Sequence, residues 1–338
     1  MNKYDIIIVG SGISGLYIAY NILKINKNVK LLILEKNNYL GGRILTFSKT
    51  INKHKYIFDE GAYRFNNNHK LLFKLINELN LMNDLIEINA GITFCPTYKF
   101  EQNMEYHENS PYYLINKVIL YSKKDKKETL QKYTFIEYVE KILNKEEIKF
   151  LMDSFGFYGI IIKTNAYNAI KLCEEGLNPS LQFYSLKNGL GTIIKELQIR
   201  ILQMGGKILL NTDVINITQD LKIITNEKIY NTKTCICAIQ KPDLLKLNIF
   251  NTIRPLLNSI GNVPLCKIYS IFKNKYLWYK NINKTTTNNS IRMVIPLDTN
   301  DGSLIISFSD GKFANGWNKL YNNINEHKFI EVVKKKYI

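Results

Sequence analysis

The sequence contains no apolar run long enough to cross a membrane. A membrane span needs roughly 20 consecutive apolar residues, and no run in the chain reaches that length. Charged residues precede the first apolar run, and no small-residue cleavage site follows it, so the pattern of a secretory signal peptide is absent. We therefore expect a soluble, intracellular protein of the cytoplasm with no transmembrane segment.

Cysteine and histidine are also scarce. The 338 residues include five cysteines and four histidines. The cysteines are scattered along the chain, which favours free thiols in a reducing compartment. The histidines show no metal-ligand spacing, and Cys235-x-Cys237 suits neither a zinc knuckle nor a CxxC redox pair. The sequence therefore predicts no metal site.

Acidic residues are outnumbered by basic ones. The chain has 29 Asp and Glu against 46 Lys and Arg, a formal net charge of +17. Such a charge is typical of proteins that bind nucleic acid, but here the lysines are spread along the whole chain among Asn, Ile and Tyr. The densest patch, residues 117–132, includes Asp125 and Glu128 and is typical of a solvated loop. We therefore expect no specific nucleic-acid partner.

The most specific pattern lies at the amino-terminus. Residues 6–9 form a short, β-branched apolar run, which is typical of a strand buried in a parallel sheet. Gly10, Gly12 and Gly15 follow directly as GxGxxG. In this motif the first glycine allows a tight turn, the second lets a pyrophosphate approach the backbone, and the third lets a helix pack against the strand. The spacing predicts a dinucleotide site.

The elements that follow support this interpretation. A helix predicted for residues 13–27 begins with Ile13 and Ser14, and its amino-terminus attracts phosphate groups. The next apolar run, residues 31–34, predicts a second strand that ends at Glu35. A carboxylate about 20 residues beyond the glycines can accept hydrogen bonds from both hydroxyls of an adenosine ribose. The alternative is an ordinary βα turn in which Glu35 only ends the strand.

Two further segments contain small residues beside charged ones. Lys36 follows Glu35, and the pair Gly41-Gly42 again lets the backbone approach a ligand. The guanidinium of Arg43 can lie beside a phosphate or the polar edge of a cofactor. In residues 57–65, Gly61 and Ala62 are small enough to let a flat ring lie against the chain, and Tyr63 and Arg64 follow them.

This order of motifs resembles the FAD-binding half of the flavin-containing amine oxidase family, whose superfamily also contains protoporphyrinogen oxidase and the carotenoid desaturases. The resemblance implies FAD as the cofactor. It assigns the cofactor contacts to Gly10, Gly12, Ile13, Ser14, Gly15, Glu35, Lys36, Gly41, Gly42, Arg43, Gly61, Ala62, Tyr63, Arg64 and Val214. In the family, the valine at the position of Val214 meets the adenine through its backbone.

The resemblance also implies a catalytic residue. In amine oxidases a lysine on a strand like that of residues 263–272 reaches the N5 edge of the flavin through a water molecule, which makes Lys267 the candidate. Strand alternation places Lys267 on one face with Tyr269 and Ile271. A lysine on an otherwise apolar face needs a partner for its ammonium, and the alternative is a strand lysine whose ammonium extends to solvent.

The family fold is α/β, with a Rossmann-like FAD-binding domain built from non-contiguous segments and an inserted α+β substrate domain. We expect residues 1–68 and 185–245 in the first domain and residues 69–184 and 246–338 in the second. Within the insert, residues 112–121 are predicted to form a strand. Residues 133–173 are predicted to be helical in three pieces, 133–143, 145–155 and 165–173, with a break at Gly156 and Gly159 between the last two.

The function implied is amine-oxidase-type hydride transfer. A substrate C–H next to an amine would give a hydride to flavin N5, and molecular oxygen would reoxidise the flavin. The partner is a small-molecule substrate such as an amine or polyamine. The alternatives are a desaturase or porphyrinogen oxidase, and a catalytically silent flavin-binding protein.

One family segment has no match. The family ends with a Gly-Glu pair and a further glycine-rich helix start, and nothing after Gly316 resembles it. We therefore expect a fragment, a natural truncation, or a chain completed by another polypeptide.

Overall fold

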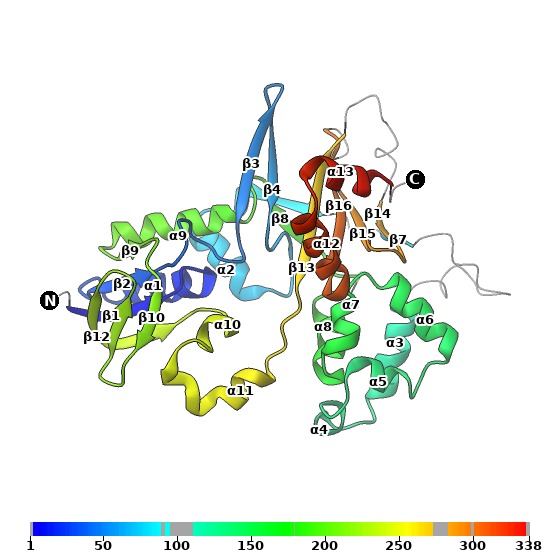
Figure 1. Cartoon of the computed structure of the whole chain (residues 1–338), viewed down its shortest axis with the longest axis horizontal. Coiled ribbons are helices and arrows are strands. Elements are labelled where there is room, and N and C mark those ends of the chain that lie inside the picture. Colours follow the sequence, from blue (N-terminus) through cyan, green and yellow to red (C-terminus); the bar gives the residue numbers. More distant parts are fainter. Residues whose placement is uncertain are drawn as a thin grey trace. The chain divides into compact units, whose positions relative to one another are not determined.

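The computed structural model describes residues 3–88, 92–94, 111–178, 180–272, 283–298 and 301–335. The chain forms two compact units. The first contains Met1–Ile88 and Phe183–Ile260, and the second contains Asn89–Gln182 and Gly261–Ile338. Each unit is therefore assembled from two separate stretches of the chain, as the coloured bar of Figure 1 lets the reader follow.

The core of the first unit is a six-stranded sheet with the order β10-β11-β12-β1-β2-β9. Strand β1 pairs in parallel with β12 and β2, and β2 pairs in parallel with β9, whereas β10, β11 and β12 are antiparallel. The strands are β1 (Lys3–Val9), β2 (Leu31–Leu34), β9 (Lys207–Leu209), β10 (Val214–Ile217), β11 (Lys222–Thr225) and β12 (Ile229–Cys237). This parallel core with flanking helices confirms the predicted α/β class.

The two faces of this sheet bury alternate residues of the same strands. Helices α1 (Ile13–Ile25) and α9 (Gly191–Gln203) cover one face and share a core with Ile8 and Ile33. Ile7 and Leu32 point to the other face and pack in a second cluster. Both faces of β1 and β2 are therefore covered, which explains their continuous apolar sequence.

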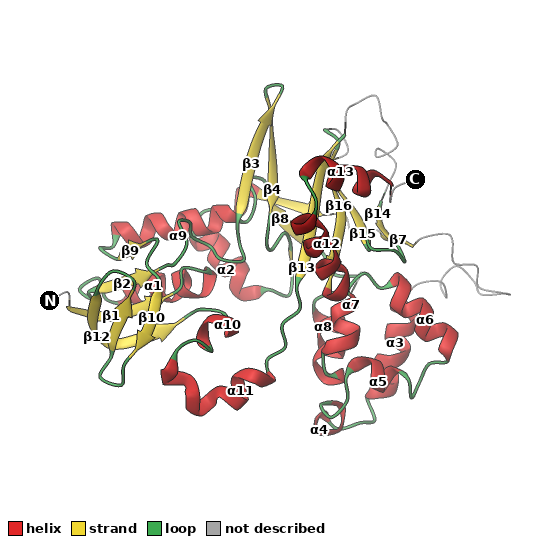
Figure 2. Cartoon of the chain, viewed as in Figure 1, coloured by secondary structure: helices red, strands yellow, loops and turns green. Residues whose placement is uncertain are grey.

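The remaining elements of the first unit are short. Strands β3 (Thr46–Ile51) and β4 (His54–Asp59) form a hairpin, and β5 (Phe65–Asn66), β8 (Phe183–Leu186) and β6 (Leu85–Ile88) form a small antiparallel sheet. The helices are α2 (Lys70–Glu78), η1 (Met82–Asp84), α10 (Lys241–Leu244), η2 (Asn248–Ile253) and α11 (Arg254–Ser259). Figure 2 shows these elements coloured by type.

The first unit extends beyond the predicted boundary at residue 68. Leu75 and Ile76 of α2 are buried in the same core as α1 and α9, and β6 pairs with β8. The second stretch of the unit likewise continues to Ile260 rather than to residue 245. Packing of these helices, which sequence motifs do not record, therefore sets the limits of the unit.

The second unit combines a five-stranded sheet with two groups of helices. The sheet order is β13-β16-β15-β14-β7, antiparallel except for the β14–β7 pair. Its strands are β7 (Ile92–Phe94), β13 (Leu265–Ile271), β14 (Lys284–Thr286), β15 (Met293–Asp298) and β16 (Ser303–Asp310). The helices are α3 (Pro111–Ser122), α4 (Lys127–Leu130), α5 (Phe135–Val139), α6 (Lys145–Ser154), α7 (Tyr158–Lys163), α8 (Ala166–Glu175), α12 (Gly311–Asn323) and α13 (Glu326–Lys335).

The strand predicted for residues 112–121 is wrong, because this stretch is helix α3. Its buried residues include Leu114, Ile115 and Val118, which follow the spacing of one helix face. They pack in a core cluster with α5, α6 and α8. The three helices predicted within residues 133–173 are confirmed as α5, α6 and α8, but the predicted break between the last two contains a further short helix, α7, which includes Gly159.

A buried arginine ties parts of the second unit together. The side chain of Arg292 is almost fully buried and donates hydrogen bonds to four backbone carbonyls. These belong to Met152 (2.9 Å), Asp153 (3.1 Å), Phe155 (3.0 Å) and Thr287 (3.2 Å). Three of the carbonyls lie at the end of α6, where they have no partner within the helix. Arg292 therefore fixes the end of α6 to the turn between β14 and β15.

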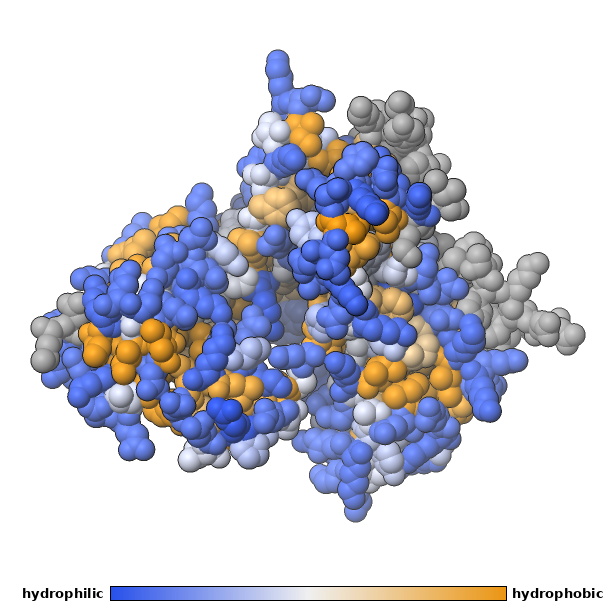
Figure 3. Space-filling model, viewed as in Figure 1, coloured by the Kyte–Doolittle hydropathy of each residue, from blue (hydrophilic) through white to orange (hydrophobic). Residues whose placement is uncertain are grey.

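Surface polarity is spread over both units. Hydrophilic residues cover most of the face in Figure 3, with smaller apolar areas between them. Among the described residues, no helix is both long and apolar enough to cross a bilayer.

Asp310 gives the second unit a pH dependence that can be tested. Burial raises the pKa of this carboxyl above its ordinary value of 3.8, although the Gly159 N–H donates a 2.8 Å hydrogen bond to Oδ2. A raised pKa in the folded state means that stability from this group is present at low pH and is lost as pH rises through the folded pKa. We therefore expect the Asp310→Asn variant to unfold at a higher urea concentration than the wild type at pH 7. The difference between the two midpoints should become smaller towards pH 4.

The control for this experiment is Asp220, whose pKa is shifted in the opposite direction. The carboxylate of Asp220 has its pKa lowered by hydrogen bonds from Lys222 and Thr218. Its contribution is therefore present at neutral pH and is lost as pH falls. Urea midpoints for Asp220→Asn are expected to lie slightly below those of the wild type at pH 7 and to meet them in acid. Equal pH profiles for both variants would contradict the role given to Asp310.

Candidate functional site

A cavity of about 650 Å³ lies in the first unit where the parallel strands end. Its walls come from the loops that follow β1 and β2, from the segment before β10 and from the end of β12. Ligands of open α/β sheets bind at this carboxyl edge of the strands. The volume lies within the roughly 300–1,000 Å³ typical of ligand pockets.

The glycines after β1 are required by close contacts. Gly10 has φ +100°, and a Cβ there would lie 2.7 Å from the Ala238 carbonyl oxygen. A Cβ on Gly15 would lie 2.1 Å from the Gly10 carbonyl oxygen, so α1 can pack here only without a side chain. Gly12 differs, because a Cβ there would meet no protein atom within 4 Å. Space is therefore kept open at Gly12, beside the first turn of α1.

A second glycine loop faces the first. The Gly41 N–H donates a 3.0 Å hydrogen bond to the Ser11 carbonyl oxygen, and Gly41 and Gly42 have φ +105° and +57°. A Cβ on Gly42 would lie 3.5 Å from the Gly12 Cα. Arg43 follows and also lines the cavity. The two loops thus line one cavity with bare backbone, as a pyrophosphate requires.

Glu35 lies at the end of β2 and is 6% exposed. Its Oε2 accepts hydrogen bonds from the Ser11 N–H (3.0 Å) and the Ser11 hydroxyl (2.6 Å). Its Oε1 accepts hydrogen bonds from the Asn37 N–H (2.9 Å) and the Asn37 side-chain amide (2.9 Å). Glu35 lines the cavity, so its carboxylate is held at the wall where a ribose is expected.

The cation next to Glu35 is paired. The Lys36 ammonium lies 2.7 Å from the Asp243 carboxylate, which also pairs with Lys246 at 2.8 Å. Burial raises the pKa of Asp243, but the hydrogen bonds from both lysines outweigh it and leave the pKa below its usual value. All three side chains line the cavity and close its wall next to α10.

The segment from Gly61 to Arg64 lies behind the Arg43 loop. A Cβ on Gly61 would lie 1.8 Å from the Arg43 carbonyl oxygen, to which the Ala62 N–H donates a 2.9 Å hydrogen bond. Burial raises the pKa of the Tyr63 phenol to about 12. The Arg64 guanidinium lies 4.0 Å from the centre of the Phe183 ring.

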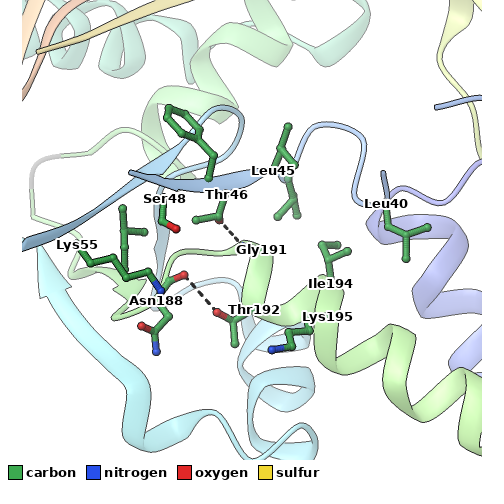
Figure 4. Close-up of a pocket in the computed structure, with 13 residues that line it drawn as sticks. Leu40, Leu45, Thr46, Ser48, Lys55, Asn188, Gly191, Thr192, Ile194 and Lys195 are labelled. Atoms are coloured by element: carbon green, nitrogen blue, oxygen red, sulfur yellow. Dashed lines mark hydrogen bonds between the residues drawn. The ribbon is translucent and has the colours of Figure 1, made fainter. Parts of the chain in front are cut away.

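A second cavity of about 550 Å³ lies between the β3–β4 hairpin and the start of α9 (Figure 4). The Thr46 hydroxyl accepts a 2.8 Å hydrogen bond from the Gly191 N–H and donates to the buried Asp59 carboxylate. Asp59 also accepts a 3.1 Å hydrogen bond from the Leu190 N–H. These bonds fix the turn before α9 to the hairpin.

Lys267 belongs to the second unit. It lies on β13 opposite Phe308 of β16, and its ammonium is 5.8 Å from the centre of that ring. The register between β13 and β16 shifts between Ile268 and Tyr269. Cys266 and Ile268 pack in the core cluster that contains Trp317 of α12. The two glycine loops and Glu35, in contrast, belong to the first unit.

Comparison with known proteins identifies the family. The family model described as flavin containing amine oxidoreductase matches residues 13–320. The chain belongs to this family. A flavin is therefore the cofactor to test against the cavity, and the open position at Gly12 together with the Glu35 carboxylate fits its dinucleotide form.

Individual relatives are distant in sequence. Mouse (Mus musculus) L-amino-acid oxidase is 23% identical over 342 residues, which cover 89% of this chain and 53% of the mouse protein. The chain thus spans about half the length of that relative. Wild-type putrescine oxidase bound to putrescine aligns with a TM-score of 0.71 at 13% identity, covering 97% of this chain and 79% of the other. A protoporphyrinogen oxidase described as putative, from Exiguobacterium sp. 255-15, aligns with a TM-score of 0.69 at 14% identity. The alignment covers 98% of this chain and 81% of the other.

The structure brings ten of the predicted cofactor residues to one cavity. They are Gly10, Gly12, Ile13, Ser14, Glu35, Lys36, Gly41, Gly42, Arg43 and Val214. Gly15 supports the turn from behind, and the cavity wall does not include residues 61–64. The predicted contacts of these residues with a flavin stay predictions.

Ser11 and Asn37, which donate the four hydrogen bonds described for Glu35, were not among the predicted site residues. Their residue types could have indicated that they bond to Glu35. Ser and Asn side chains readily bond to groups nearby in the chain, and Asn37 lies two residues beyond the predicted ribose ligand.

Proposed function

We propose that the chain binds FAD and serves as an amine-oxidase-type oxidoreductase. The observation that carries the proposal is the combination of an open Gly12 beside the start of α1 with a buried carboxylate in the same cavity. The first suits a pyrophosphate and the second suits a ribose. FMN lacks the adenosine half, so this pair of features favours FAD.

Each part of the cavity has an assigned task. The backbone of the turn from Gly10 to Gly15 and the first turn of α1 bind the pyrophosphate. Glu35 accepts the ribose hydroxyls, Val214 lies against the adenine, and Arg43 contacts the polar edge of the cofactor. When bound, the flavin supplies a hydride acceptor at N5 and is reoxidised by oxygen.

Cofactor binding is the first test. The purified chain is titrated with FAD and, in parallel, with FMN, and binding is followed by quenching of flavin fluorescence. We expect saturable binding of FAD, competition by ADP, and much weaker binding of FMN. Absence of flavin in the purified protein together with no binding of added FAD would contradict the proposal.

Lys267→Met tests the chemical step. We propose that this lysine orients a water molecule used in flavin oxidation and reduction, a role that rests on the family resemblance. Loss of the ammonium is expected to slow flavin reduction or reoxidation by about 10²–10⁴-fold, as measured by stopped-flow absorbance. FAD affinity should be unchanged. Rates equal to those of the wild type would remove the assigned role and favour a desaturase or porphyrinogen oxidase.

The substrate is proposed to be a small molecule with a C–H next to an amine. The names of two similar proteins, an L-amino-acid oxidase and a putrescine oxidase bound to putrescine, support this class. Anaerobic mixing with a panel of amino acids, diamines and polyamines should bleach the flavin with at least one member. Admission of oxygen should then release peroxide. Bound flavin that no member of the panel reduces would favour a silent flavin-binding protein.

A further inference from the structure

The Glu35 carboxylate already accepts as many hydrogen bonds as it can. An ionised carboxylate has about four acceptor positions, and Glu35 receives four hydrogen bonds, two on each oxygen. Ser11 donates both bonds to Oε2, and Asn37 donates both to Oε1. A ribose diol that donates two further hydrogen bonds to Glu35 therefore has to replace two of the donors already in place.

The four donors differ in their freedom to move. Two are backbone N–H groups, of Ser11 and Asn37, and the Ser11 backbone is fixed by the hydrogen bond from its carbonyl oxygen to the Gly41 N–H. The other two are the Ser11 hydroxyl and the Asn37 amide, which leave by rotation about side-chain bonds. Asn37 lines the cavity, so its amide lies at the cavity wall. Ser11 is fully buried and does not line the cavity, so its hydroxyl has to turn away from Oε2 before a group in the cavity can bond there.

We infer that the Ser11 hydroxyl and the Asn37 amide use the two acceptor positions of Glu35 that the ribose hydroxyls need, and that the diol binds by displacing these two hydrogen bonds. This inference rests on the proposed binding of FAD. The two side chains satisfy a buried carboxylate while the cavity holds no nucleotide, since an unsatisfied buried carboxylate is costly. They therefore stabilise the cofactor-free protein and weaken binding of the cofactor by the same free energy.

The test uses Asn37→Ala and Ser11→Ala, with Asn38→Ala as the matched control. Asn38 is the neighbouring amide, is exposed, and does not line the cavity. Binding of ADP and of 2′,3′-dideoxy-ADP is measured by calorimetry, and unfolding of the nucleotide-free protein by urea. We expect each test variant to bind ADP roughly two- to tenfold more tightly, as the loss of one competing hydrogen bond predicts. The nucleotide-free form of each should be less stable.

Two internal checks make the result specific to the diol. The gain in ADP affinity should match the loss of stability of the nucleotide-free protein, because both arise from the same bond. The dideoxy nucleotide, which has no diol, should bind the variants and the wild type equally. Asn38→Ala should change neither quantity.

Wild-type binding of FAD and ADP together with unchanged or weaker ADP binding in both variants would overturn this inference and leave the proposed function standing. Weaker binding would show that the two side chains contact the nucleotide directly. A wild type that binds neither FAD nor ADP would overturn the proposed function, and this inference with it.

Discussion

Replacing Gly12 with alanine is expected to weaken FAD binding by roughly 30- to 150-fold without changing the stability of the cofactor-free protein. Gly12 has φ −65° and ψ 173°, a conformation that alanine adopts without strain. The added methyl meets no protein atom within 4 Å, so the fold accepts it. It projects into the space proposed for the pyrophosphate, and overpacking of this kind costs about 2–3 kcal/mol. Fluorescence titration with FAD and urea unfolding of the cofactor-free protein measure the two quantities.

Gly15→Ala is the matched comparison, since the two glycines lie three residues apart in one motif. Its methyl would lie 2.1 Å from the Gly10 carbonyl oxygen, so α1 has to move away from β1. We expect a loss of about 3 kcal/mol in unfolding free energy and weaker FAD binding. If both variants lost stability equally, the open space at Gly12 would not be a ligand position.

Replacing Arg292 with methionine is expected to cost the second unit about 3–5 kcal/mol of unfolding free energy. Methionine has a similar length but donates no hydrogen bond, so four buried or half-buried carbonyls lose their partner at once. Arg292→Lys should keep little of this stability, because one ammonium carries three donors and lacks the planar guanidinium that reaches four acceptors. Urea unfolding followed by the two tryptophans gives the measurement, since Trp317 is buried in the second unit.

Arg254→Met provides the control for that experiment. The Arg254 guanidinium also donates to a carbonyl, that of Leu245, and to the Asn251 side chain, but these bonds are exposed to solvent. Its loss should change the unfolding free energy by less than about 1 kcal/mol. If both substitutions lowered the unfolding free energy equally, burial of the Arg292 hydrogen bonds would not be the reason for their contribution to stability.

The sequence alone predicts the proposed nucleotide site of the first unit, because the patterns that mark this site are local. Gly15 is needed because a Cβ there would meet the Gly10 carbonyl oxygen of the same turn, and Glu35 follows the adjacent strand. Sterics and strand periodicity therefore determine both. Helix α3 was predicted as a strand because Tyr112–Tyr121 is a short apolar run, which fits either period until its packing against α6 and α8 is known.

Interactions between segments that are distant in the chain could not be predicted from the sequence. Arg292 reaches carbonyls about 140 residues away in the chain, and no local pattern marks an arginine for burial. The four bonds to Glu35 were missed for another reason. The motif marks the carboxylate as a ligand-binding group and carries no sign of the protein donors that also bond to it.

The sheet of the first unit has a consequence for synthesis on the ribosome. Strand β1 is made before its parallel neighbour β12, which begins at Ile229, after the whole stretch Asn89–Gln182 of the second unit. Until then one edge of β1, whose last four residues are apolar, lacks its β12 partner, and such edges favour association with other chains. The nascent chain therefore carries an unpaired apolar strand edge until the residues of β12 have been made, and this edge favours binding to chaperones that associate with emerging chains.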